Sequence, residues 1–156
     1  MGIQLTSSVF EDGGDFPIDY TCNGRNVSPP LTISNVPEGV ASLVLIFDDP
    51  DAAKEPAGNG TTFDHWTVFN ILPADQKIAE DSIPSGGELG RNSRGTIAYI
   101  GPCPPTFRHQ YVFRLLALDC KLNLSKQPTK SEVQETIKGH IVEEARLVSY
   151  YEQPEK

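Results

Sequence analysis

Hydrophobic side chains gather in short runs that are separated by polar segments rich in glycine and proline. Residues 42–47 form a continuous run between turn-forming residues, which is typical of a strand buried on both faces. Residues 65–72, 96–100 and 110–118 are rich in β-branched and aromatic side chains and predict three further strands. Shorter runs predict strands at residues 3–7, 31–33 and 146–151.

One segment near the C-terminus has the spacing of a helix. Ser131 is the expected N-cap, and apolar residues four apart form one face. Gly139 interrupts this pattern and predicts a break or a second short helix there. Residues 75–78 predict a weaker helical or irregular segment. The apolar face consists of Val133, Ile137 and Ile141.

Many strands followed by one late helix predict a mainly β, antiparallel protein, either a sandwich or a partly open barrel. The length of 156 residues fits a single domain over residues 1–156. The connections at residues 48–64 and 81–95 are long and irregular. Loops of this length in a small domain usually carry function, so we expect the site there.

The charge of the chain narrows the classes of partner. Its 21 acidic residues outnumber its 13 basic ones, giving a net charge of −8. That balance argues against non-specific nucleic-acid binding and against docking on anionic lipid surfaces. No 18-residue apolar run predicts a transmembrane helix, and no signal-peptide pattern is present. We therefore expect a cytoplasmic protein without integral membrane association.

The three cysteines, Cys22, Cys103 and Cys120, are widely separated and form no CxxC motif. In a reducing compartment an odd count favours free thiols, and no metal site is predicted. Cys120 follows an apolar run and is expected in the core. Cys22 and Cys103 both lie beside turn residues, so a disulfide between them stays open as an alternative.

Three carboxylates lie where the buried strand at 42–47 ends, in Asp48-Asp49-Pro50-Asp51. Their mutual repulsion can leave one carboxyl protonated near neutral pH, and a protonated carboxyl donates a hydrogen bond to a phosphate oxygen. The alternative is a turn whose aspartates accept hydrogen bonds from local backbone N–H groups. The local sequence leaves both interpretations open.

Two histidines open predicted strands directly after long loops. His65 precedes one strand and His109 precedes another, so both can reach one cavity. Imidazole donates hydrogen bonds and can carry charge near physiological pH, which suits anion recognition. Pro104 and Pro105 hold the backbone before His109 rigid. His140, on the predicted helix, is expected to be a surface or packing residue.

An ordered set of motifs resembles the phosphatidylethanolamine-binding protein family over nearly the whole chain. The motifs are Asp49-Pro50-Asp51-Ala52, His65-Trp66, Tyr99-Ile100-Gly101-Pro102-Cys103-Pro104-Pro105 and His109-Gln110-Tyr111-Val112-Phe113. The likeness is greatest to the bacterial and archaeal branch, which is described as Raf kinase inhibitor-like. It implies a large antiparallel sheet packed on a smaller one, with a few peripheral helices, one of them near the C-terminus.

The resemblance also implies a pocket for phosphate, phosphorylethanolamine, acetate or similar anions. Two positions depart from the family pattern: Gln110 stands where the motif has arginine, and Ser149 stands where glycine is frequent. Loss of the arginine removes a permanent charge inside or behind the pocket. The implied ligand-binding residues are Asp49, His65, His109, Tyr111, Pro104 and Pro105, supported by Asp51, Trp66 and Gly101.

Three functions compete at this point. The first is a binding protein for a small anionic ligand, without catalytic residues, metal or cofactor. The second is an inhibitor of a kinase or a serine protease that acts through a surface separate from the pocket. The third is a metal-dependent or acid–base hydrolase built from two histidines and one aspartate. No HExxH, GxSxG or CxxC spacing supports the third, and the resemblance also allows a homodimer.

Overall fold

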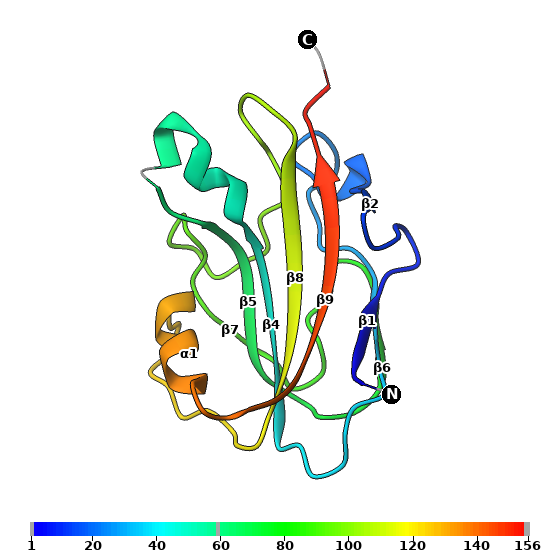
Figure 1. Ribbon diagram of the computed structural model, residues 1–156, viewed down its shortest axis with the longest axis vertical. Coiled ribbons are helices and arrows are strands. Elements are labelled where there is room, and N and C mark those ends of the chain that lie inside the picture. The colour runs from blue at the N-terminus through cyan, green and yellow to red at the C-terminus, as the bar shows by residue number, and fades with distance from the viewer. Residues whose placement is uncertain (1, 59, 155–156) are drawn as a thin grey trace.

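The computed structural model describes residues 2–58 and 60–154, which form two β-sheets packed face to face (Figure 1). The smaller sheet has the order β1 (Gln4–Thr6), β3 (Leu31–Ser34), β6 (Gln76–Ile78). The larger sheet has the order β2 (Gly14–Asp15), β9 (Ile141–Tyr151), β8 (His109–Leu118), β4 (Ser42–Asp49), β5 (Phe63–Ile71), β7 (Glu88–Leu89). Neighbouring strands are antiparallel except β2 and β9. The prediction of a mainly β, two-sheet protein is confirmed.

The central strand β4 is buried along its whole length. Leu43, Leu45 and Phe47 belong to the main core between the two sheets. Val44 and Ile46 belong to a second core on the other face, which the helix α1 (Lys130–Ile137) covers. This alternation follows from the period of two along a strand, and the absence of polar residues at 43–47 fits burial on both faces.

The helix begins two residues earlier than predicted. Its N-cap is Thr129, whose side chain accepts a hydrogen bond from the Glu132 N–H while the Glu132 carboxylate accepts one from the Thr129 N–H. This reciprocal pair satisfies two N-terminal donors, which Ser131 as N-cap would not. The helix ends at Ile137, since Gly139 has a φ of +80°. Ile141, expected on the helix, is instead the first residue of β9.

Two further predictions are corrected, a strand at residues 96–100 and a helical or irregular segment at residues 75–78. Residues 96–100 form no strand, because the Asn92 side chain accepts hydrogen bonds from the Thr96 and Arg94 N–H groups and donates one to the Ala98 carbonyl. The backbone there is bonded locally instead of joining a ladder. Residues 75–78 contain the strand β6, which pairs with β3. With three residues, β6 is too short for the alternation of apolar and polar side chains that would identify a strand in the sequence.

The expectation of free thiols at Cys22 and Cys103 is wrong, because the structure joins them in a disulfide with Cα atoms 5.5 Å apart. The Cys22 N–H also donates to the Pro102 carbonyl, which aligns the two segments. Cys120 is free and only partly buried, packed against the second core. None of the helices within residues 2–58 and 60–154 is long and apolar enough to cross a membrane.

Candidate functional site

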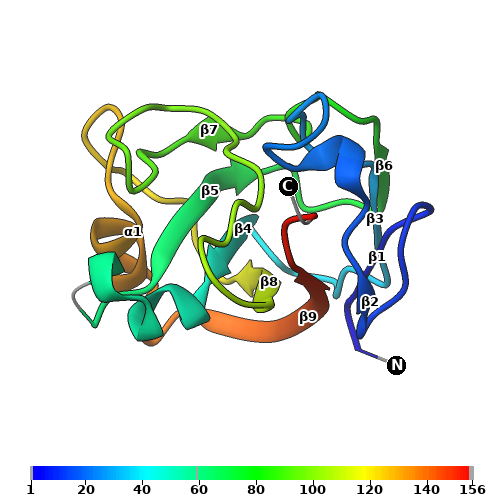
Figure 2. The same cartoon turned by 90° about the horizontal axis from the view of Figure 1, so that it is seen from above.

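A cavity of about 270 Å³ lies at one end of the larger sheet, where β4 ends and β5 and β8 begin. Figure 2 looks onto this end and shows the 3₁₀ helices Pro50–Lys54 and Pro56–Gly58 beside the ends of β4 and β5. The cavity therefore lies among irregular segments held by the sheet, as expected. The residues predicted to bind a ligand, Asp49, His65, His109, Tyr111, Pro104 and Pro105, all line it, together with Gly101.

Strand register explains why these side chains converge. Phe47 of β4 is paired with Phe113 of β8, and their rings lie 3.9 Å apart in the main core. Asp49 is two residues beyond Phe47, and His109 and Tyr111 are four and two residues before Phe113. Because side chains alternate along a strand, all five lie on the same face of the sheet.

The three neighbouring aspartates separate instead of sharing one site. Asp48 lies on the opposite face, where it contacts Arg114 at 2.6 Å and the buried Lys130 at 3.2 Å. Lys130 also forms an ion pair with Asp64. Asp49 Oδ1 accepts a hydrogen bond from the Ala52 N–H at 3.1 Å, which matches the turn interpretation, whereas Asp51 accepts one from the distant Gln110 N–H at 2.7 Å.

His109 lies between two carboxylates. Its Nδ1 is 2.6 Å from Asp49 Oδ2, and its Nε2 is 2.9 Å from Glu55 Oε1. The Thr106 hydroxyl also donates to Glu55, at 2.8 Å. Glu55 lines the cavity and is buried, yet sequence reasoning missed it, because one acid in an irregular loop gives no sign of where it points.

Each of the two short contacts of His109 requires a proton between nitrogen and oxygen. The ring is then either a cation between two anions or a neutral ring between one anion and one carboxylic acid, so the group carries one net negative charge either way. Burial raises the pKa of Asp49, although the hydrogen bond from His109 opposes the shift. Burial also opposes ionisation of Glu55, but hydrogen bonds from His109 and Thr106 outweigh it and lower its pKa. A raised aspartate pKa matches the expectation, but the main cause is burial and not repulsion between aspartates.

His65 differs from His109 in its hydrogen-bond partners. Its Nδ1 is 2.6 Å from the Ile100 carbonyl oxygen, so Nδ1 carries the proton and Nε2 keeps its lone pair. Burial lowers the pKa of His65 to about 4. His65 is therefore neutral at physiological pH, which corrects the expectation that both imidazoles can offer charge to a ligand.

The Tyr111 hydroxyl is fully buried and makes no hydrogen bond of ordinary length within the described part of the chain, although the Asp49 side chain and the Cys103 backbone lie near enough to shift its pKa. Burial raises the pKa of Tyr111, and the charge of Asp49 raises it further. The phenol therefore stays protonated and remains a hydrogen-bond donor. Buried polar groups are almost always paired, so this donor is available to an acceptor that enters the cavity.

Arg94 is a second residue that sequence reasoning missed. It lines the cavity from an exposed turn, and its guanidinium forms no ion pair with any residue in 2–58 or 60–154. A guanidinium at a cavity mouth attracts anions and can form paired hydrogen bonds with a phosphate or a carboxylate. An arginine in a Gly- and Asn-rich turn gave no signal that separates it from an ordinary surface residue.

Of the predicted supporting residues, Gly101 lines the cavity, whereas Asp51 and Trp66 do not. Trp66 is buried, with its ring edge-on to Tyr99 at 5.6 Å, and does not line the cavity. Gly101 allows a close approach, because a Cβ there would lie 2.4 Å from the Tyr20 carbonyl oxygen. Neither departure from the family pattern lies in the cavity wall: Gln110 is absent from it, and buried Ser149 pairs with Tyr111 across β8 and β9.

The hydrolase alternative needs two histidines and an aspartate around one metal ion. Both nitrogens of His109 are occupied by carboxylates, and His65 has one nitrogen on a carbonyl. In the described residues the one group of three metal-ligating side chains is Asp119, Cys120 and His140, which lies elsewhere. His140 is a surface residue, as expected.

Comparison with known proteins decides the family. The pattern described as phosphatidylethanolamine-binding protein matches residues 6–152. The chain belongs to the phosphatidylethanolamine-binding protein family.

Three relatives of this family member match it over almost their whole length. A UPF0098 protein of Methanothermobacter thermautotrophicus is 42% identical over 155 residues, covering 96% of this chain and 98% of that protein. A crystal structure of a phosphatidylethanolamine-binding protein homolog, CT736 from Chlamydia trachomatis, superposes with a TM-score of 0.92 at 38% identity, covering 98% and 99% of the two chains. Escherichia coli YbcL, described as a new member of the mammalian family, gives a TM-score of 0.87 at 29% identity, covering 99% and 100%. The names of these relatives contain no enzymatic activity.

Proposed function

We propose that this family member binds a small phosphate- or carboxylate-bearing ligand in the cavity beside His109 and Tyr111. The observation that carries the proposal is the buried Tyr111 hydroxyl without a partner. A ligand oxygen that accepts from this hydroxyl removes the cost of an unpaired buried donor. A small anion has such acceptors and brings the negative charge that the nearby Arg94 attracts.

Glu55 occupies the position that an anionic ligand takes on His109. Its carboxylate oxygen Oε1 lies 2.9 Å from His109 Nε2. A phosphate or carboxylate oxygen can replace it there, because both are anionic acceptors of similar geometry. Glu55 belongs to the irregular segment beside the 3₁₀ helix Pro50–Lys54, so its displacement leaves the sheet intact. Anion binding thus competes with an internal carboxylate, which predicts modest affinity.

The remaining groups set the size and polarity of the ligand. A cavity of about 270 Å³ suits a small headgroup better than a drug-sized molecule. Pro104 and Pro105 form a wall with little conformational freedom. His65 offers only the lone pair of Nε2, which favours a ligand with a donor of its own, such as an ammonium or a protonated phosphate. Phosphorylethanolamine has both the anionic and the donor group.

The test is calorimetric titration of protein dialysed free of phosphate and acetate, with inorganic phosphate, phosphorylethanolamine and acetate as separate ligands. We expect binding to the wild type, a loss in His109→Gln, and a weaker affinity in Arg94→Gln. Arg146→Gln, which removes an exposed arginine of β9 paired with Glu144, is the matched control and should bind as the wild type does.

Glu55→Gln separates competition from simple absence of a site. Removing the internal carboxylate should raise phosphate affinity about tenfold, the equivalent of one charge-assisted hydrogen bond. If neither the wild type nor Glu55→Gln binds any of the three ligands at millimolar concentration, the proposal fails. The cytoplasmic location, inhibition of a kinase or protease, and a homodimer stay predictions.

A further inference from the structure

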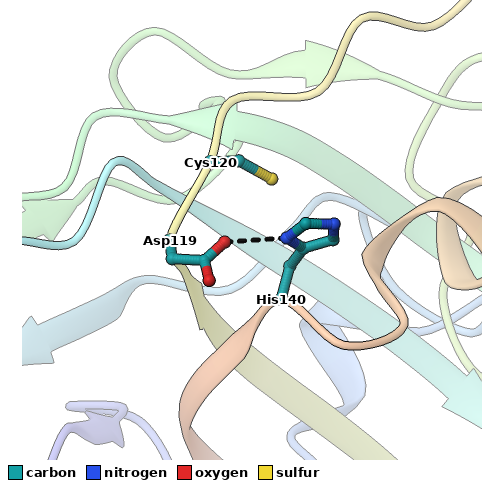
Figure 3. Close-up of side chains that lie close together, drawn as sticks. All are labelled: Asp119, Cys120 and His140. Atoms are coloured by element: carbon teal, nitrogen blue, oxygen red, sulfur yellow. Dashed lines mark hydrogen bonds and ion pairs between the residues drawn. The ribbon is translucent and has the colours of Figure 1, made fainter.

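A second group of reactive side chains lies at the opposite end of β8 and β9 from the cavity. Asp119 and Cys120 directly follow β8, and His140 directly precedes β9. Figure 3 shows the carboxylate, the sulfur and the imidazole turned toward a common space. One donor atom from each of the three residues lies within 4.8 Å of the other two. The pairing of β8 with β9 brings together residues that are 20 positions apart in the sequence.

The backbone of all three residues is held in place. The Asp119 N–H donates to the His140 carbonyl at 3.0 Å, and the His140 N–H donates to the Ile137 carbonyl at 3.0 Å. The Cys120 carbonyl accepts from the Ser42 hydroxyl at 2.6 Å. Among the side chains, His140 Nδ1 is 2.8 Å from Asp119 Oδ1. The backbone of the group is therefore held in place before any ligand arrives, which lowers part of the entropy cost of binding.

The donor set selects the chemical class of the ligand. Thiolate, imidazole and carboxylate together match Zn²⁺, whereas Mg²⁺ and Ca²⁺ take oxygen donors. Donor atoms around tetrahedral Zn²⁺ lie about 3.5 Å apart, as follows from bond lengths of about 2.0–2.3 Å. A separation within 4.8 Å needs only side-chain rotation, and the side chains of His140 and Asp119 are 47% and 54% exposed, so they are free to rotate.

We propose that Asp119, Cys120 and His140 bind a Zn²⁺ ion, with a water molecule in the fourth position. On binding, the Cys120 thiol releases its proton to solvent, and the Nδ1 proton of His140 that was donated to Asp119 passes to solvent or, through solvent, to Nε2. The ring then carries a proton on Nε2 alone, and Nδ1 coordinates the metal. The Asp119–His140 hydrogen bond is replaced by two bonds to the ion. The site fixes the junction between α1 and β9 against the end of β8. It shares no residue with the cavity, so its test is independent of the proposed anion binding.

Cobalt is the probe, because Co²⁺ in a thiolate site gives a sulfur-to-metal charge-transfer band that reports the Cys120 ligand directly. Protein kept under a non-thiol reductant and freed of metal by a chelator is titrated with Co²⁺ and then with Zn²⁺. We expect saturation at one equivalent, the charge-transfer band, and its loss as Zn²⁺ displaces Co²⁺. Reductant strength must leave the disulfide intact, which mass spectrometry of the alkylated protein checks.

Variants assign the ligands. Cys120→Ser should abolish the charge-transfer band, and His140→Gln should weaken Zn²⁺ binding at least tenfold in calorimetry. Glu135→Gln removes an exposed carboxylate of α1 that is paired with Lys138 and should leave Zn²⁺ affinity unchanged. Circular dichroism establishes that each variant is folded. Absence of the band in the folded wild type, or Zn²⁺ affinity that is equal in wild type, Cys120→Ser and His140→Gln, would overturn the proposal.

Discussion

Replacing Tyr111 with phenylalanine tests the central feature of the cavity in the absence of any ligand. The substitution removes only the hydroxyl, which is buried and has no partner in the described residues. An unpaired buried polar group costs about 1–3 kcal/mol, so its removal should stabilise the protein. Allowing for the few contacts that the oxygen makes, we expect the free energy of unfolding of Tyr111→Phe to rise by about 1 kcal/mol.

Tyr99→Phe is the matched control. Tyr99 and Tyr111 both pack against Phe47, with ring centroids at 5.8 Å and 6.2 Å. The Tyr99 hydroxyl, however, donates to the Tyr20 carbonyl at 2.8 Å. Its removal loses that bond and leaves the carbonyl unpaired, so Tyr99→Phe should lower the free energy of unfolding by about 1–2 kcal/mol. The same chemical change is thus expected to have opposite signs at two neighbouring positions.

Urea unfolding of phosphate-free protein at neutral pH measures both variants, and thermal unfolding should shift by about 2–4 °C for each kcal/mol. Added phosphate should then stabilise the wild type more than Tyr111→Phe, because only the wild type gains the hydrogen bond from the Tyr111 hydroxyl on binding. If Tyr111→Phe is destabilised as much as Tyr99→Phe, the Tyr111 hydroxyl is paired in solution, and the main support for an anion site is lost.

Three further predictions concern stability. The free energy of unfolding should fall by about 3 kcal/mol between pH 6.5 and pH 4 through His65. In this range the unfolded ring binds a proton, whereas the folded ring, with a pKa of about 4, does not. The free energy of unfolding, measured by urea at several pH values, should depend less on pH in His65→Gln than in the wild type. The disulfide spans 81 residues, so replacing Cys22 and Cys103 with serine should cost up to about 4.5 kcal/mol in the same assay. Lys130→Met should cost about 3–5 kcal/mol because it leaves two aspartates without their shared cation, whereas Lys138→Met on the exposed face should change stability by less than about 0.5 kcal/mol.

The parts of the fold that could be predicted are those fixed by burial. The apolar run at 43–47 has no polar position to place in water, so a strand buried on both faces is the one element that accommodates it. His65 and His109 lie at the beginnings of strands whose patterns are equally plain, which placed them at one end of the sheet. The motif order then indicated which side chains face the cavity.

The features that could not be predicted arise from contacts of loop segments, whose sequences have neither helical nor strand periodicity. Glu55 reaches His109 because of the path of an irregular loop. Residues 96–100 have strand composition, but the Asn92 side chain bonds the nearby backbone first. Asp119, Cys120 and His140 form no motif along the chain, and only the register of β8 with β9 brings them together.

The margins of the larger sheet bear on how the protein behaves at high concentration. Its outermost strands, β2 and β7, have two residues each and offer little template for a strand of another molecule. In the part of β5 that does not pair with β7, the Asp64 and His65 carbonyls accept hydrogen bonds from the backbone N–H groups of Ser93 and Ile100. Along β9, the stretch that β2 does not reach carries Glu143, Glu144 and Arg146, and inserting these charges between stacked strands is unfavourable. The folded protein is therefore protected against fibril-like growth by strand addition, so aggregation should require the sheet to open first.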